Sequence, residues 1–471
     1  MHVERPGSAG STAHLGMSAR NPGAAGAKPP PVRPLSVPVP KSLDIKLFGC
    51  IISGMRMLRN SARILGGAFL LSLTLSAQTL TILYSFNSQA YGPAGPNPGV
   101  VLGPQGEIYG ATAVGGRWDS GTVYELLPPA SRGAAWTERV LHSLNDEDGG
   151  EPVAGLTMGP NGSLYGITAS AAFKLDPPMG TSTHWAYGVI HQFTGADGVP
   201  FGGLLFGSPL GHGQSLYGAT RVPGGNGSVF RLTPPAATGG AWTYTTVYTF
   251  PGGSLGSAVV GGLAVGTDGT LYGATDDGGY VEGGQCSPGC GTVFSLTPPA
   301  QAGGPWTERI LHAFNPARGD GARPAAGVLI GPGGVLYGTT TKGGDGNSGT
   351  VYSLTPPTVQ GAPMTETILH AFAGSEGGFE PFWPPVLGPN GVLYGTTEFV
   401  DGGCSANGTG AVFELATPAS PGGSWTETIL YSFPCNEFGT SPAGLTVASD
   451  GTLFGTSDGD YGMGSVFALT P

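Results

Sequence analysis

The stretch GPNGSLYG, residues 159–166, decides the fold of this chain, because close variants of it return throughout the sequence. Its Asn-Gly pair favours a tight turn, and it runs directly into an aliphatic and aromatic pair followed by another glycine. The string occurs seven times, starting at Gly103, Gly159, Gly211, Gly266, Gly331, Gly388 and Ala448. Repetition at this spacing is typical of the structural unit of a repeat protein and not of an active-site loop.

Each repeat carries four short segments that read as β-strands. In the repeat that contains GPNGSLYG they are AGLTMG (154–159), SLYGIT (163–168), AAFKLDPP (171–178) and HWAYGVIHQF (184–193). Alternation and β-branched or aromatic content predict a strand for each segment, and Asn161-Gly162 predicts a tight hairpin between the first and second strands. The aromatic residue of the second strand returns every 52 to 65 residues along the chain.

Seven units of four antiparallel strands, without a helical pattern, predict an all-β fold, a seven-bladed β-propeller. The ends of the repeat region support ring closure. TLTILYSF (79–86) reads as a lone fourth strand, and the chain stops after a third strand, GSVFALTP (464–471). We expect the N-terminal strand to complete the last blade, which leaves no unpaired edge at that position.

The first 77 residues differ from the repeats. Residues 1–54 are rich in Pro, Gly, Ala and Ser without periodicity, and are interpreted as a disordered extension or a mis-assigned start. Residues 55–77 combine arginines, the apolar run ILGGAFLLSLTL (64–75) and Ala77, as in a secretory signal peptide. The apolar run is short for a bilayer span, so a permanent anchor is the less favoured alternative. The expected mature protein is a propeller of residues 78–471, secreted or at the bacterial cell surface.

Charge narrows the class of partner. After residue 77 the chain carries 10 basic and 28 acidic side chains, a net charge of 10 − 28 = −18. Binding a nucleic-acid backbone or anionic lipid requires clustered Lys and Arg, so we expect neither a nucleic-acid partner nor stable membrane insertion after signal cleavage. The expected protein is a monomer whose partner is an extracellular glycan or another protein.

The motif LYGTTTKGGDGNSGTVYSLTP (336–356) and its relatives across residues 80–471 resemble a bacterial family of tandem-repeat extracellular proteins described as GloVer-containing. Members of that family carry LYGTT and GGxxGTVF motifs and assorted C-terminal surface anchors. The resemblance implies export and a propeller-like repeat, and it implies no established reaction.

Three features that could suggest a metal site, a sugar platform or a catalytic serine are interpreted as structural. His142, His191, His312 and His370 share one fourth-strand position with Tyr84, Tyr248 and Tyr431, and equivalent strands at the rim lie too far apart for the histidines to converge on a metal ion. Five tryptophans open the fourth strand and are expected to pack the blades. The string GGSLG (252–256) fits a nucleophile elbow around Ser254 but lacks the helix that such an elbow needs, so no catalytic residue is predicted.

Ligand-binding residues are expected where the repeats disagree, on the loops at one face of the ring, because function concentrates on scaffold loops. Aromatic side chains beside aspartates are typical of carbohydrate sites, and the candidates are Trp118, Tyr280, Trp383, Phe399, Tyr461, Asp277, Asp458 and Asp460. Acidic Gly-rich loops of this kind also suit Ca²⁺, the one cofactor considered, although turn formation alone explains their composition.

The four cysteines after residue 77 suggest disulfides in an exported protein. The expected pairs are Cys286 with Cys290 and Cys404 with Cys435, and zinc held by all four is the alternative.

For function, a binding or scaffold module is the first hypothesis. A glycan lyase or glycoside hydrolase, whose hydrolysis would need carboxyl groups roughly 5–10 Å apart, is the second. A purely structural envelope protein is the third, and the sequence does not select a carboxylate pair.

Overall fold

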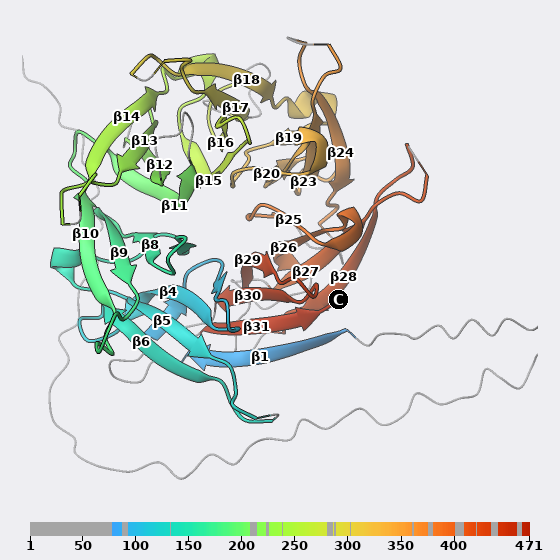
Figure 1. Cartoon of the computed structure of the whole chain (residues 1–471). Helices are drawn as coiled ribbons and strands as arrows, with labels where there is room; N and C mark the ends of the chain where they lie inside the picture. The colour runs from blue at the N-terminus through green and yellow to red at the C-terminus, as the bar shows by residue number, and fades with distance from the viewer. Residues whose placement is uncertain are drawn as a thin grey trace, which may run out of the picture. The chain divides into compact units, whose positions relative to one another are not determined.

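The repeats fold into seven antiparallel sheets that form the blades of a ring, seen along its axis in Figure 1. The computed structural model describes residues 78–86, 93–131, 133–207, 214–222, 226–237, 239–279, 286, 289–301, 303–359, 362–374, 380–400, 409–420, 422–434, 441–458 and 464–471. The predicted extension (1–54) and signal peptide (55–77) lie outside these residues. The prediction of a seven-bladed, all-β propeller is confirmed.

Each blade has its first strand at the centre of the ring and its fourth at the rim (Figure 1). Blade 1 contains β2 (Pro93–Pro96) and β3 (Val101–Leu102) as its divided first strand, then β4 (Ile108–Gly115), β5 (Thr122–Leu127) and β6 (Thr137–Ser143). Blade 2 contains β7 (Thr157–Met158), β8 (Leu164–Ile167), β9 (Ala171–Asp176) and β10 (Ala186–Gln192). Blade 3 contains β11 (Val199–Gly207), β12 (Ser215–Arg221), β13 (Ser228–Thr233) and β14 (Thr243–Thr249).

The remaining blades follow in chain order. Blade 4 contains β15 (Val259–Val265), β16 (Leu271–Thr275), β17 (Thr292–Thr297) and β18 (Thr307–Ala313). Blade 5 contains β20 (Leu329–Ile330), β21 (Leu336–Thr340), β23 (Thr350–Thr355) and β24 (Thr365–Ala371), with β19 (Gly321–Ala322) paired to β22 (Lys342–Gly343) beside it. Blade 6 contains β25 (Val386–Leu387), β26 (Leu393–Val400), β27 (Thr409–Ala416) and β28 (Thr426–Ser432). Blade 7 contains β29 (Ser441–Val447), β30 (Leu453–Asp458), β31 (Gly464–Thr470) and β1 (Thr79–Phe86).

The two ends of the repeat region close the ring. β1 pairs with β31 in antiparallel register from Thr79 opposite Thr470 to Phe86 opposite Gly464. Blade 7 also bonds to blade 1, since the Thr446 hydroxyl donates to the Val100 carbonyl at 2.7 Å. The N-terminal strand therefore completes the last blade, as the sequence predicts.

The glycine after the second-strand aromatic residue has a packing reason. A Cβ atom added to Gly166 would lie 2.3 Å from Cζ of Phe173 on the neighbouring third strand. In the other blades the same contact joins Gly110 with Tyr124, Gly218 with Phe230, Gly273 with Phe294, Gly338 with Tyr352, Gly395 with Phe413 and Gly455 with Phe467. The LYG and GTVF-type motifs are thus two halves of one contact, in which an aromatic ring fills the space that the glycine leaves.

A second glycine lets neighbouring blades approach. A Cβ atom on Gly291, at the start of the third strand of blade 4, would lie 2.4 Å from Cδ of Pro324 in blade 5. Equivalent contacts join Gly121 to Pro152, Gly349 to Pro381, Gly410 to Pro442 and, across the closure, Gly464 to Pro96. The Gly of the GTV motif and the Pro that begins the next blade therefore fix the spacing between blades.

The fourth-strand tryptophans pack between blades, as expected. The ring of Trp185 meets Tyr109 of the preceding blade edge to face at 5.7 Å between centroids. Trp242 meets Tyr165 at 6.1 Å and Trp306 meets Tyr217 at 6.0 Å in the same way. Such edge-to-face pairs add stability beyond the apolar area that they bury.

Helical structure is limited to short 3₁₀ turns in the part of the chain that the structure describes. These are η1 (Asp146–Asp148), η3 (Gly253–Leu255), η4 (Pro316–Arg318), η5 (Pro332–Gly334) and η6 (Pro389–Gly391). Across the described residues, the structure contains no helix with the length and hydrophobicity needed to cross a membrane.

Candidate functional site

The repeats diverge at the position that follows the LYG motif by three residues, where the second strand ends. This position holds Ala113, Ala169, Arg221, Asp276, Thr341, Glu398 and Asp458 in blades 1 to 7. Several of these residues bond to the segment that leads into the first strand of the same blade. The backbone N–H of Glu398 donates to the carbonyl of Glu380 at 3.3 Å, and that of Thr341 donates to the carbonyl of Arg323 at 3.0 Å. The non-repeating side chains are thus brought to the same end of the inner strands.

The two acceptor residues hold strained backbone conformations. Arg323 has a φ of 56° and Glu380 a φ of 57°, and each directly precedes a proline. A residue before proline favours extended backbone, and a left-handed conformation costs a non-glycine residue on the order of 1 kcal/mol or more. Backbone strain of this kind concentrates at functional sites, so it indicates that a ligand site lies at this end of the inner strands.

A pocket of about 280 Å³ opens at this end, between blades 6, 7 and 1. We call it the three-blade pocket, and it is lined by Gly95, Pro96, Asn97, Pro98, Ala113, Phe382, Trp383, Glu398, Ser441, Pro442, Ala443 and Asp458. Its volume lies just below the range for small-molecule sites, roughly 300–1,000 Å³. A single ring of a larger ligand is the size of group that fits it.

One wall of the three-blade pocket is aromatic. Phe382 and Trp383 lie edge to face with their ring centroids 5.6 Å apart, and the Phe382 side chain is 40% exposed. The Trp383 carbonyl accepts a hydrogen bond from the Thr339 hydroxyl of blade 5 at 3.1 Å. This bond fixes the backbone that carries both rings.

Other lining residues of the pocket are acidic or polar. Burial, and then the negative charges of Glu380 and Asp458, raise the pKa of the Glu398 carboxyl above its ordinary value. Glu380 itself forms an ion pair with Lys342 of blade 5. Asn97 and Ser441 add an amide and a hydroxyl to the lining. The pocket therefore presents hydrogen-bonding oxygens beside an aromatic wall.

The structure gathers only part of the residue set predicted from the sequence. Trp383 and Asp458 line the three-blade pocket together. Trp118 is 52% exposed, and the Arg117 guanidinium lies 4.6 Å from its ring centroid. Asp277 is in blade 4, where the Thr275 hydroxyl donates to its carbonyl at 2.8 Å. Tyr280, Tyr461, Asp460 and the side chain of Phe399 lie outside the described residues.

Sequence reasoning missed three polar residues of the pocket, Asn97, Glu398 and Ser441. A signal for Glu398 was available, because it occupies the divergent position after the LYG motif. Asn97 and Ser441 carry no comparable signal, since their role depends on which blades meet at the closure.

The cysteines follow the expected pairing where they are described. Cys286 and Cys290 form a disulfide with a Cα–Cα separation of 5.1 Å. Both sulfur atoms are consumed by this bond, which disfavours the alternative of zinc held by four thiolates. Cys404 and Cys435 lie outside the described residues.

Two other hollows are less suited to a ligand. One of about 610 Å³ is lined by Arg323, Lys342 and Asn347 among others, but Arg323 lies 3.8 Å from Asp276 and Lys342 is paired with Glu380. Another of about 480 Å³ lies beside the Gly159–Ser163 hairpin, where Lys174 pairs with Asp176 at 2.6 Å. In both hollows the charged groups already have protein partners.

At the rim, the residue at the His/Tyr position of a fourth strand lies near the second residue of the fourth strand in the next blade. The contacts are an ion pair or hydrogen bond, a ring stack, or an apolar or electrostatic contact. The pairs are Tyr84–Glu138, His142–Tyr187, His191–Tyr244, Tyr248–Glu308, His312–Glu366 and His370–Glu427. At the interface of blades 6 and 7, Tyr431 and Leu80 pack against the same hydrophobic cluster. The four histidines therefore serve four separate interfaces and do not converge, as the sequence predicts.

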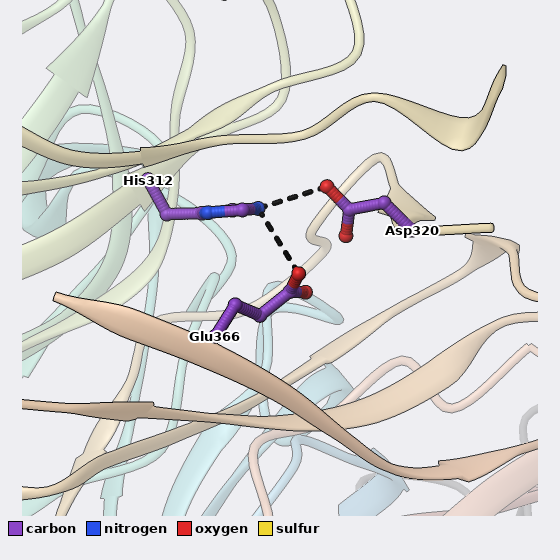
Figure 2. A group of neighbouring side chains, drawn as sticks. All are labelled: His312, Asp320 and Glu366. Atoms are coloured by element: carbon purple, nitrogen blue, oxygen red, sulfur yellow. Dashed lines mark hydrogen bonds and ion pairs between the residues drawn. The ribbon is translucent and has the colours of Figure 1, made fainter. Parts of the chain in front are cut away.

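One interface gathers a histidine with two carboxylates (Figure 2). His312 Nε2 lies 2.9 Å from Asp320 Oδ2 and 3.6 Å from Glu366 Oε2. Burial, and then the hydrogen bond and charge of Asp320, raise the pKa of Glu366 to about 9. Burial alone would raise the pKa of Asp320, but its hydrogen bonds with His312 and Glu366 lower it.

The neighbouring interface predicts a pH dependence of stability. Burial raises the pKa of Glu427 to about 7 and lowers that of His370, whose Nε2 lies 3.3 Å from Glu427 Oε2. Because the folded pKa exceeds the ordinary value of about 4.5, this carboxyl stabilises the fold fully below pH about 4.5 and loses that contribution as pH rises through about 7.

We expect the contribution of the Glu427 carboxyl to the free energy of unfolding to fall by about 2–3 kcal/mol between pH 4.5 and 8. Glu427→Gln should flatten that part of the profile, as measured by urea unfolding at a series of pH values. Glu147→Gln, at an exposed position, is the control and should leave the profile unchanged. An identical slope in wild type and Glu427→Gln would show that Glu427 is not the titrating group.

Solved structures with a similar arrangement cover most of the chain at low identity. They include virginiamycin B lyase from Staphylococcus aureus, at 13% identity and a TM-score of 0.49, covering 84% of this chain and 99% of that one. A Trichoderma reesei enzyme of Carbohydrate-Active Enzymes Family AA12 has 14% identity and a TM-score of 0.42, covering 84% and 96%. The pyranose dehydrogenase PQQ domain from Coprinopsis cinerea has 12% identity and a TM-score of 0.40, covering 84% and 97%. None of these likenesses bears on the activity of this chain.

The evidence for the family of this chain comes from its repeat sequence. No curated protein is similar enough in sequence to match the chain. The model of the Gloeobacter/Verrucomicrobia repeat matches residues 58–286 and again residues 281–471, which together include every blade. The LYG glycine contacts, which recur in all seven blades, give these matches a structural basis throughout the ring. The chain belongs to the Gloeobacter/Verrucomicrobia repeat family.

Proposed function

We propose that this protein is an exported binding module that holds one sugar ring of an extracellular glycan in the three-blade pocket. The observation that carries the proposal is that the aromatic pair Phe382 and Trp383 lines one small pocket together with Glu398 and Asp458. The repeats supply a rigid scaffold, and the pocket lies where they differ from one another.

The aromatic and the polar lining residues suit the two kinds of surface that a sugar ring presents. The face of an aromatic ring is negatively polarised and attracts the C–H bonds on the flat side of a pyranose. Carboxylate and amide oxygens accept hydrogen bonds from hydroxyl groups, and Glu398, Asp458 and Asn97 supply such oxygens. A few polar groups beside an apolar wall are the usual composition of a small-ligand site.

Charge narrows the class of glycan. The pocket carries two carboxylates, and the chain after residue 77 has a net charge of −18 from 10 basic and 28 acidic side chains. Uronic acid or sulfated polymers would be repelled from such a surface. A neutral or amino-bearing polysaccharide fits this charge best.

Two features support an extracellular setting. Residues 55–77 have the basic, apolar and small-residue parts of a secretory signal. The Cys286–Cys290 disulfide favours an oxidising compartment, because such bonds are rare in the bacterial cytoplasm.

The test is a polysaccharide array probed with the full chain and with two tryptophan variants. We expect binding to neutral or amino-bearing polysaccharides, and Trp383→Ala should weaken it at least about tenfold, since an aromatic anchor in a binding site is worth about 2 kcal/mol or more. Trp118→Ala removes an exposed tryptophan outside the pocket and should bind as wild type does.

Absence of binding to any polysaccharide, or equal loss in the two variants, would contradict the proposal. Release of new reducing ends or unsaturated products from a bound polymer would instead assign the pocket to a hydrolase or lyase. Glu398, with its raised pKa beside Asp458, would then be the first candidate for the acid.

A further inference from the structure

The geometry points to a second site, unrelated to the pocket: a Zn²⁺ site at the rim that joins blade 4 to blade 5 through His312, Asp320 and Glu366 (Figure 2). The three side chains come from different segments of the chain. His312 lies on β18 of blade 4, Asp320 on the connection between the blades, and Glu366 on β24 of blade 5. A metal ion held by all three would therefore link two repeats.

The donor atoms are close enough to share one ion. One ligand atom from each residue lies within 4.8 Å of the other two. Nε2 of His312 is 2.9 Å from Asp320 Oδ2 and 3.6 Å from Glu366 Oε2. Ligands bound at about 2.0–2.2 Å in a tetrahedral zinc site are separated by somewhat more than 3 Å, so only small side-chain movements are needed.

The ligands are also held in place by their surroundings. Asp320 is buried, and its carboxylate accepts hydrogen bonds from the backbone N–H of Asn315 at 2.9 Å and of Gly321 at 2.6 Å. The His312 ring packs edge to face against Phe314 at 4.8 Å. Such outer contacts orient metal ligands and are a regular part of metal sites.

The cluster of His312, Asp320 and Glu366 still has an oxygen atom available to bind a metal ion. Within the described part of the chain, Glu366 Oε1 is shielded from solvent and has no hydrogen-bond partner. The side chains of His312 and Glu366 are still 18% and 17% exposed, which leaves access for an ion and a water molecule. Imidazole with two carboxylates suits Zn²⁺, whereas Ca²⁺ requires six to eight oxygen ligands.

The other rim interfaces show what distinguishes this one. At the interface of blades 1 and 2, His142 and Asp148 are 3.0 Å apart, but Tyr187 stacks on the histidine in the place of Glu366. At that of blades 2 and 3, Tyr244 stacks on His191. Among the residues that the structure describes, the interface of blades 4 and 5 is the one that gathers three metal-ligand types of side chain.

The test uses the full chain stripped of metal with a chelator and then dialysed against ZnCl₂. We expect one equivalent of Zn²⁺ per chain by elemental analysis and a higher melting temperature with zinc than without. His312→Gln and Glu366→Gln should each weaken zinc binding at least about tenfold. His142→Gln alters the matching position of another interface and should retain the zinc of wild type.

A second measurement uses the wild-type protein, so that the inference can be tested even if a variant does not fold. Bound zinc should protect His312 from acylation by diethylpyrocarbonate, as measured by peptide mass spectrometry, and should leave His142 as reactive as before. The inference is overturned by a stoichiometry of zero, by binding that survives in both folded variants, by unprotected His312, or by equal binding of CaCl₂ in place of ZnCl₂. A failure of the glycan array leaves this result unaffected, because the pocket and the rim cluster share no residue.

Discussion

Gly395→Ala is expected to lower the free energy of unfolding by about 3 kcal/mol, because the added methyl group overpacks the core between two blades. The new Cβ atom would lie 2.3 Å from Cζ of Phe413, which is fully buried on the paired strand. Phe413 has little room to move, since its ring meets Phe372 of blade 5 edge to face at 5.4 Å. Urea unfolding of the purified variant measures the change.

Gly188→Ala is the matched control. Gly188 also lies in a strand, but a Cβ atom there would meet nothing within 4 Å, so the substitution should leave stability within about 0.5 kcal/mol of wild type. Adding Phe413→Leu to Gly395→Ala should recover part of the loss, because a smaller side chain frees the space. Equal stability of Gly395→Ala and wild type would contradict the packing role of the LYG glycine.

Deletion of residues 79–86 from the full chain is expected to cost more than about 5 kcal/mol, since the loss of one buried aromatic such as Phe86 costs about 3–5 kcal/mol. Phe86 is 2% exposed and packs on Tyr124 of blade 1 at 5.1 Å. The deletion also uncovers the edge of β31, which favours pairing with other chains. Thermal unfolding and light scattering should show a lower transition and aggregation.

Relocating the strand provides the control for this deletion. A chain without residues 79–86 but with TLTILYSF added after Pro471, through a copy of residues 417–424, restores blade 7 in continuous order. We expect this variant to recover a melting temperature within a few degrees of wild type. An unchanged melting temperature after the simple deletion would show that β1 does not close the ring.

Most of the scaffold could be predicted because it depends on local patterns. The Asn-Gly turn, the alternating strands and the spacing of Tyr109 through Phe454 each act within one repeat. Even ring closure follows from counting strands at the two ends. The packing partners of the repeated residues, such as Phe413 for Gly395, follow from strand register once the sheet order is known.

The sites could be predicted only in part, because they depend on contacts between blades. Trp383 and Asp458 were accessible as residues that break the repeat, but their joining with Asn97 requires that blade 7 meet blade 1 at the closure. The rim cluster is similar. His312 and Glu366 occupy ordinary positions of the repeat, and only the register of one blade on the next brings Glu366 within 3.6 Å of the imidazole.

The central claim is that the ligand binds in the three-blade pocket, where the repeats differ in sequence. The repeated hairpins are then part of the scaffold and do not bind the ligand. Hydrogen–deuterium exchange of the full chain, with and without the polysaccharide that binds most tightly on the array, tests it most directly. We predict slower exchange with ligand in peptides that contain Gly95–Pro98, Phe382–Trp383 and Ser441–Ala443, and no change in the Gly159–Ser163 hairpin. Slower exchange at the hairpins or the rim, with none at the pocket, would contradict the account.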